Sequence, residues 1–192
     1  MLRSVYIASL FSLLLFSCGT GKSKEADPGA ADFFPVKPYL LQQLHRIDSL
    51  SLPTTLIRQA DGRSDTLAIS AAECREMATP FLEPDISTEP LKSRYKETSF
   101  ADQSIPSITF TYTTADSSLP LKRTDVVLKP DPVMTDQVKS IYMEKLYQVG
   151  DTLVTDKLFW KADHYYQVIS SRQWGENTPR IRTMKVVWDL SE

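Results

Sequence analysis

The sequence predicts an α+β domain: an antiparallel, curved β-sheet of five to seven strands in a meander, with two short helices packed on one face. Two segments with apolar residues at helical spacing lie in the first half of the chain, and strand-like segments fill the second half. Outside the N-terminal region, glycine occurs only between pairs of strand-like segments, where hairpin turns need a positive φ: Gly62, Gly150 and Gly175.

The first element expected is a helix that begins near Pro38, a residue suited to the first helical position, and ends before Pro53. Its apolar residues recur at helical spacing: Leu40, Leu41, Leu44 and Ile47. Residues 54–69 follow with two β-prone arms around Asp61-Gly62, which indicates a β-hairpin.

A second helix is predicted from Ser70, because Ser70 and Glu73 have the spacing of a capping box. That helix presents four residues on one face: Cys74, Met77, Ala78 and Phe81. Residues 80–106 are expected to be irregular, since four prolines interrupt them: Pro80, Pro84, Pro90 and Pro106. A loop of this length is either functional or an ordered surface crossing held by Leu91, Tyr95 and Phe100.

The C-terminal half is expected to form the meander, because Ile108, Phe110 and Tyr112 alternate with threonines at a period of two. Further strands are predicted at 122–129, 138–148, 152–161, 164–174 and 181–190. The segment 138–148 also fits helical spacing, so its class stays open. The three tryptophans are each 14 residues apart, which fits one strand plus one turn: Trp160, Trp174 and Trp188.

The N-terminus carries an export signal. Arg3 precedes an apolar run from Val5 to Phe16, and a helix of that length rises roughly 18 Å, too little for a hydrocarbon core of about 30 Å. Leu15-Phe16-Ser17-Cys18 resembles the lipobox of bacterial lipoproteins, whose type II signal peptide is cleaved before the cysteine. The resemblance implies a diacylglyceryl thioether on Cys18 and acylation of its new amine. The alternative is an ordinary secretory signal that contains Cys18 by chance.

The chain therefore divides into a signal peptide (1–17), a lipidated cysteine with a flexible tether (18–34) and a single soluble α+β domain (35–192). The order of its elements resembles that of small uncharacterised envelope lipoproteins of Bacteroidota-type bacteria. Gly19 after the cysteine is compatible with lipid-anchored delivery to the outer membrane, facing either the periplasm or the cell surface.

No catalytic or metal-binding motif is found in the sequence, so no enzyme activity, catalytic residue or metal ligand is predicted. His45 is interpreted as a helix-boundary residue, His164 as a turn residue and Cys74 as a small core residue. Gly19-Thr-Gly-Lys-Ser23 lacks the first glycine of a phosphate-binding loop, because Phe16 holds that position. The net charge of −2 and the absence of a basic stripe exclude nucleic acid as an expected partner.

The aromatic residues of the second half supply the one candidate ligand face: Tyr142, Trp160, Tyr166, Trp174 and Trp188. They either fill the layer between sheet and helices or form an incompletely covered face that binds an apolar or glycan ligand.

The function expected first is a non-catalytic binding or accessory domain, presented to an unknown envelope protein by a membrane lipid anchor. The alternative is a carrier-like domain that holds a lipid or other apolar ligand on the curved sheet. An envelope hydrolase is a third hypothesis. No cofactor is expected apart from the covalent lipid on Cys18.

Overall fold

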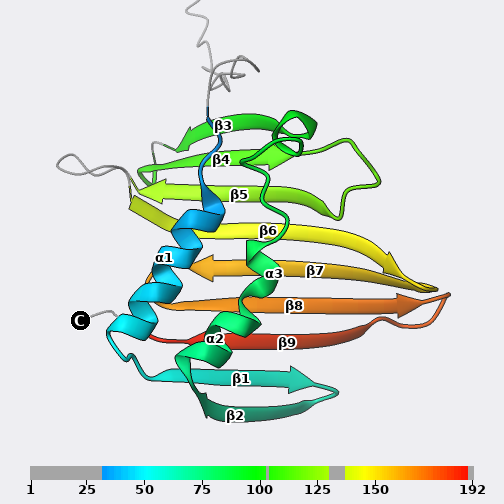
Figure 1. The fold of residues 1–192 in the computed structure, drawn as a ribbon. Coiled ribbons are helices and arrows are strands. Elements are labelled where there is room, and N and C mark those ends of the chain that lie inside the picture. Colours follow the sequence, from blue (N-terminus) through cyan, green and yellow to red (C-terminus); the bar gives the residue numbers. More distant parts are fainter. Residues whose placement is uncertain (1–31, 103, 130–136, 190–192) are drawn as a thin grey trace, which may run out of the picture.

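A single nine-stranded antiparallel sheet organises the computed structural model, which describes residues 32–102, 104–129 and 137–189. The strand order is β2-β1-β9-β8-β7-β6-β5-β4-β3 (Figure 1). The strands are β1 Thr54–Ala60, β2 Arg63–Ile69, β3 Lys96–Asp102, β4 Ser107–Thr113, β5 Leu121–Lys129, β6 Gln137–Val149, β7 Thr152–Lys161, β8 Tyr165–Trp174 and β9 Arg180–Val187.

The last strand pairs with the first. Strands β3 to β9 follow one another as a meander, and β9 then lies beside β1, with Val186 opposite Leu56. The hairpin β1–β2 therefore extends the sheet instead of forming a separate unit. Asp61 and Gly62 form its turn with φ values of 50° and 74°, the left-handed conformation expected of this dipeptide.

Three helices lie across one face of this sheet: α1 Val36–Ser49, α2 Ala71–Met77 and α3 Thr79–Leu82 (Figure 1). The capping box at the start of α2 is confirmed: the Ser70 hydroxyl accepts from the Glu73 N–H at 3.2 Å, and the Ser70 N–H donates to the Glu73 carboxylate at 2.8 Å. A short 3₁₀ helix, Lys92–Arg94, precedes β3.

The core lies between these helices and the middle of the sheet, and aromatic rings fill its centre. Trp160 stacks on Tyr166 with ring centroids 5.0 Å apart, and Trp188 lies 5.3 Å from Trp160. Phe81 of α3 meets both Trp160 and Tyr166 edge-on at 5.4 Å. All four side chains are at most 1% exposed, so these ring contacts pack α3 tightly against the sheet.

The α+β class, the antiparallel meander and the helices on one face are confirmed, but the sheet has nine strands instead of five to seven. Both arms of the 54–69 hairpin join the main sheet, and β3 emerges from the segment expected to be irregular. Its sequence, KETSFAD, shows no apolar alternation, because an edge strand has little side chain to bury. With the short α3, the described residues form three α-helices instead of two, and residues 137–149 form a strand.

The predicted signal peptide (1–17), Cys18 and most of the expected tether (18–34) lie outside the described residues. Within the described part of the chain, no helix combines the length and apolar character needed to cross a membrane.

Candidate functional site

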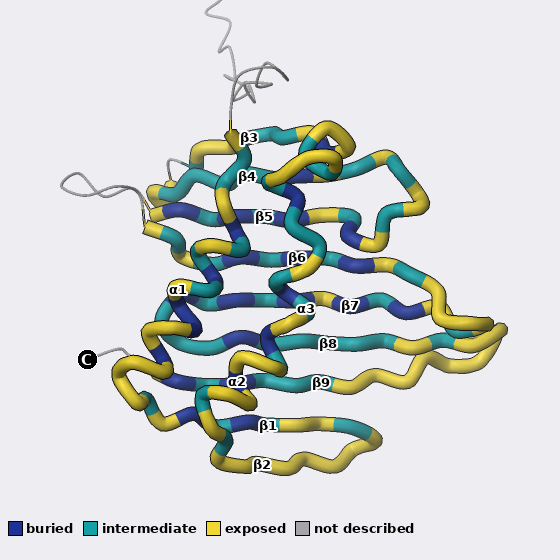
Figure 2. The backbone as a smooth tube through the Cα atoms, in the orientation of Figure 1, coloured by how far each residue is buried: buried dark blue, intermediate teal, exposed yellow. Residues whose placement is uncertain are grey.

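The helix-covered face of the sheet continues beyond the helices, and this uncovered end carries the candidate site. Tyr166 of β8 points into the core, and every second residue after it in β8 lies on the same face, ending with Arg172 and Trp174. Burial falls along this row: Tyr166 is fully buried, whereas Arg172 and Trp174 are exposed (Figure 2).

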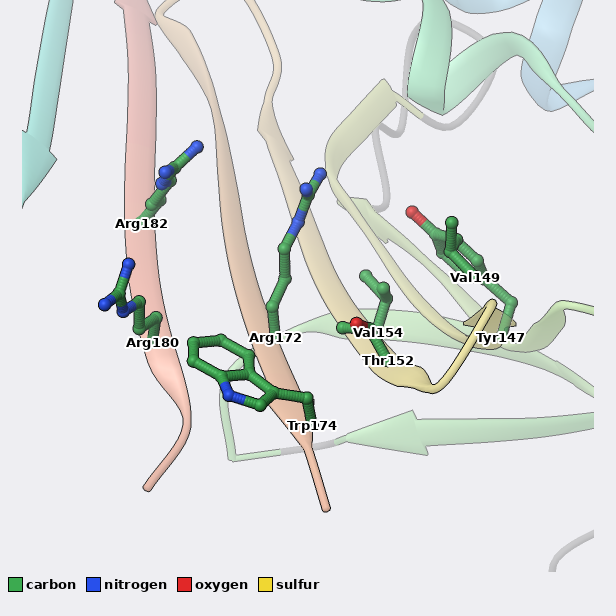
Figure 3. Close-up of a pocket in the computed structure, with 8 residues that line it drawn as sticks. All are labelled: Tyr147, Val149, Thr152, Val154, Arg172, Trp174, Arg180 and Arg182. Atoms are coloured by element: carbon green, nitrogen blue, oxygen red, sulfur yellow. The ribbon is translucent and has the colours of Figure 1, made fainter. Parts of the chain in front are cut away.

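A cleft of about 320 Å³ opens at this end of the sheet (Figure 3). Its walls come from the ends of β6, β7, β8 and β9, which are joined by the hairpin turns at Gly150 and Gly175. The lining residues are Tyr147, Val149, Thr152, Val154, Arg172, Trp174, Arg180 and Arg182.

Three arginines from two neighbouring strands give the cleft its charge. Arg172 is directly opposite Arg180 in the β8–β9 register, and Arg182 is two residues further along β9. Like charges placed directly opposite on a sheet repel each other. No ion pair with a carboxylate is found for any of the three in the described ranges. The lining contains three arginines and no acidic residue, so the side chains that line the cleft carry net positive charge.

Two more arginines extend this positive surface onto the neighbouring hairpin. Ala60 is paired with Arg182 on one side and with Arg63 on the other, which puts both arginines on the same face as the cleft. Arg58, two residues before Ala60, shares that face and is opposite Asp65. We call these five residues the arginine cluster: Arg58, Arg63, Arg172, Arg180 and Arg182.

An aromatic wall completes the cleft. Trp174 is 37% exposed, and the Arg180 guanidinium lies 5.1 Å from the centre of its ring. A cation over an indole face is attracted by the ring quadrupole, so this contact orients both side chains.

A buried polar network lies beneath the inner end of the cleft. The Tyr147 hydroxyl donates to Asp156 Oδ2 at 2.8 Å, and Asp156 itself is buried. Its second oxygen, Oδ1, has no hydrogen-bond partner among the described atoms. On the adjacent strand, Lys145 donates to the carbonyls of Pro80 and Glu83, which ties the end of α3 to the sheet. Burial lowers the pKa of Lys145, and the nearby Asp156 charge opposes that shift.

The five aromatic residues proposed from the sequence as a ligand face are not brought together. Trp160, Tyr166 and Trp188 fill the layer between sheet and helices, which is the packing alternative stated above. Tyr142 lies on the opposite face of the sheet, opposite Phe159 and Asp125. Trp174 alone lines the cleft.

The arginine cluster was missed at the sequence level, although a signal for part of it exists. Arg180 and Arg182 alternate along a strand, and the β8–β9 hairpin, whose register is centred on Glu176, brings Arg172 opposite Arg180. The strand predicted at 181–190 begins one residue after Arg180, and pairing about Gly175 would place Arg172 opposite Thr178, so the predicted strands alone do not give the register of this cationic pair.

The residues weighed for catalysis lie apart from the cleft. His45 is exposed on α1. His164 lies in the β7–β8 turn, as interpreted from the sequence, and its Nδ1 is 2.9 Å from Asp189 Oδ1. Cys74 is fully buried, and burial raises the pKa of its thiol to about 11, which disfavours the nucleophilic thiolate. Among the described residues, no group of three or more His, Cys, Asp or Glu side chains is arranged to hold a metal ion.

Fold and cleft together define an α+β domain built on one antiparallel sheet, with a cationic, aromatic-walled cleft at its uncovered end. No known family model and no curated protein sequence matches this chain.

Proposed function

We propose that this chain is a lipid-anchored protein of the bacterial outer membrane whose domain serves as a non-catalytic binding or accessory module. The lipobox-like residues before Cys18 support the anchor. In this proposal the cleft beside the arginine cluster binds the anionic group of a ligand or of an envelope partner.

The observation that carries the proposal is the arrangement of Arg172, Arg180 and Arg182 around one cleft, with no ion pair to a carboxylate for any of them in the described structure. A guanidinium remains charged at all physiological pH values and offers a fork of donors that fits phosphate or carboxylate oxygens. The chain as a whole has a net charge of −2, so the positive charge is a local property of this site. A bound anion would relieve the repulsion between Arg172 and Arg180.

The carrier-like alternative, with an apolar ligand on a curved aromatic sheet, has less support. Three of the aromatic side chains that it requires are in contact with one another beneath the helices, and each is at most 1% exposed. An apolar ligand in the arginine-lined cleft would desolvate those charges without pairing them, which is unfavourable.

The anion site is tested with the intact protein, purified in a non-ionic detergent, by calorimetric titration with tripolyphosphate. The double variant Arg172→Ala/Arg182→Ala should bind at least about tenfold more weakly, because charge-assisted hydrogen bonds to the anion are lost. Arg75→Ala is the matched control, since Arg75 is an exposed arginine on α2, away from the cleft. Equal binding by the wild type and the double variant would overturn the proposed site.

The anchor is tested separately. Intact-mass analysis should show lipid on Cys18, and Cys18→Ser should move the protein from the membrane fraction to the soluble fraction. An unmodified mass, or unchanged membrane association of the variant, would remove the anchor from the proposal.

A further inference from the structure

We propose that the ligand of the cleft is an acidic sugar: a pyranose ring stacked on Trp174, with its phosphate or carboxylate bound by Arg172 and Arg182. This inference rests on the proposed function, since it names the ligand class of the same site.

Along the strand direction, Trp174 lies at the mouth of the cleft, and Arg172 and Arg182 lie further inside it. Trp174 follows Arg172 by two residues on the same face of β8, which separates their Cα atoms by roughly 7 Å. Arg182 lies one further step inward on β9. A sugar ring and the acidic group attached to it span about the distance from Trp174 to Arg172. Arg182 lies about 13 Å from Trp174 along the strand direction, so its long side chain has to reach toward the same acidic group.

The polar groups around the cleft suit hydroxyl groups. Thr152 and Tyr147 both line it, and Asp156 fixes the phenol of Tyr147 through a hydrogen bond of 2.8 Å. Asp156 is buried beneath the cleft and does not line it, so its role is to hold the Tyr147 hydroxyl in place. A bare phosphate would use the arginines but would not contact the exposed part of Trp174, whose ring already carries the Arg180 guanidinium at 5.1 Å.

The size of the site and the charges around it favour a small ligand over an extended polyanion. A volume of about 320 Å³ lies at the lower end of the range for small-molecule sites, about 300–1,000 Å³. Asp151 and Glu176 lie in the hairpin turns beside the cleft and are exposed. These carboxylates would repel an anionic membrane surface approaching the hairpin tips.

The experiment titrates the intact protein in non-ionic detergent with glucose 1-phosphate, glucuronate, inorganic phosphate and glucose. Heat and tryptophan fluorescence are both recorded. Trp160 and Trp188 are at most 1% exposed, so a fluorescence change on binding reports Trp174. We expect at least one acidic sugar to bind about tenfold more tightly than inorganic phosphate, and glucose to bind weakest. If glucose 1-phosphate binds more tightly than glucuronate, the preferred acidic group is a phosphate; if glucuronate binds more tightly, it is a carboxylate.

The variants separate the contribution of the ring from that of the charge. Trp174→Ala should reduce acidic-sugar affinity to that of inorganic phosphate without changing phosphate affinity, and Trp174→Phe should restore part of the difference. Arg172→Ala should weaken both ligands. Thermal unfolding of each variant verifies that the fold is retained.

The two proposals fail in different ways. If inorganic phosphate binds as tightly as both acidic sugars and Trp174→Ala changes nothing, the sugar class is refuted and the anion site stands. If tripolyphosphate and every other anionic probe bind no better than glucose, both proposals are overturned.

Discussion

The two ends of one sheet face differ sharply in what they present. Strands β7, β8 and β9 begin or end under the helices with Trp160, Tyr166 and Val186, which lie side by side and are fully buried. On the same face, at the other end of β8 and β9, Arg172 and Arg180 lie side by side and are exposed. Figure 2 shows this change from buried to exposed along the strands.

The difference shows that one backbone arrangement serves two purposes. At the covered end, aromatic rings in contact hold the helices to the sheet and stabilise the fold. At the uncovered end, side chains of the same register place like charges together, which costs stability and is typical of a binding site. Stability and binding should therefore respond to substitution at opposite ends of the same strands.

The largest expected effect is a difference in stability loss between substitutions of Trp160 and Trp174. Trp160→Ala should lower the free energy of unfolding by about 3–5 kcal/mol, because it leaves a cavity where Trp160 contacts three other rings. Trp174→Ala should lower it by less than about 1 kcal/mol, since that ring is partly in solvent. Urea unfolding followed by circular dichroism measures both values. Equal losses would mean that the cleft belongs to the core.

Lys145 lies between the covered and the uncovered end of the sheet and holds α3 to it. Lys145→Met should destabilise the protein by about 2–3 kcal/mol, because the carbonyls of Pro80 and Glu83 lose a charged donor. The nearby buried Asp156 also loses a compensating charge. Urea unfolding gives the size of the loss. Amide hydrogen exchange should show faster exchange first at α3, and an unchanged α3 would contradict this role.

Alkaline pH should lower the free energy of unfolding through the buried tyrosines of the helix-covered core. Burial raises the pKa of Tyr166 far above 10, and it raises the pKa of Tyr95 to about 12. Below pH 10 these phenols are neutral in both states. Above pH 10 the unfolded chain releases protons that the folded chain keeps, so the free energy of unfolding falls with rising pH.

Each fully buried tyrosine should cost about 1.4 kcal/mol of stability by pH 11. Tyr166→Phe removes one such group, together with its 2.7 Å hydrogen bond to the Cys74 carbonyl. The variant should therefore be less stable at pH 8 yet lose about 1.4 kcal/mol less than the wild type between pH 8 and pH 11. Urea unfolding at the two pH values tests this, and parallel losses would contradict it.

Local patterns account for what could be predicted from the sequence. Period-two alternation and turn glycines located five strands of the meander, and the Ser70–Glu73 spacing located the start of α2. The segment 138–148, left open between strand and helix, is β6. The pairing of β1 with β9 joins residues more than 100 positions apart, and no local pattern encodes it. The same long-range pairing brings the β1–β2 hairpin, with Arg58 and Arg63, next to the strand that carries Arg182, so the full arginine cluster is a property of the tertiary structure.

The smallest expected effect tests the charge repulsion itself. Arg180→Gln should raise the free energy of unfolding by a few tenths of a kcal/mol, because it removes a like charge directly opposite Arg172. Loss of the contact between Arg180 and Trp174 offsets part of this gain. Added salt screens the repulsion, so 0.5 M NaCl should stabilise the wild type more than the variant. Arg75→Gln on α2 is the control, for which salt should act as in the wild type. If Arg180→Gln destabilises the protein at low salt and keeps the full salt response, the arginines do not repel one another measurably, and the cleft needs no anion to relieve strain.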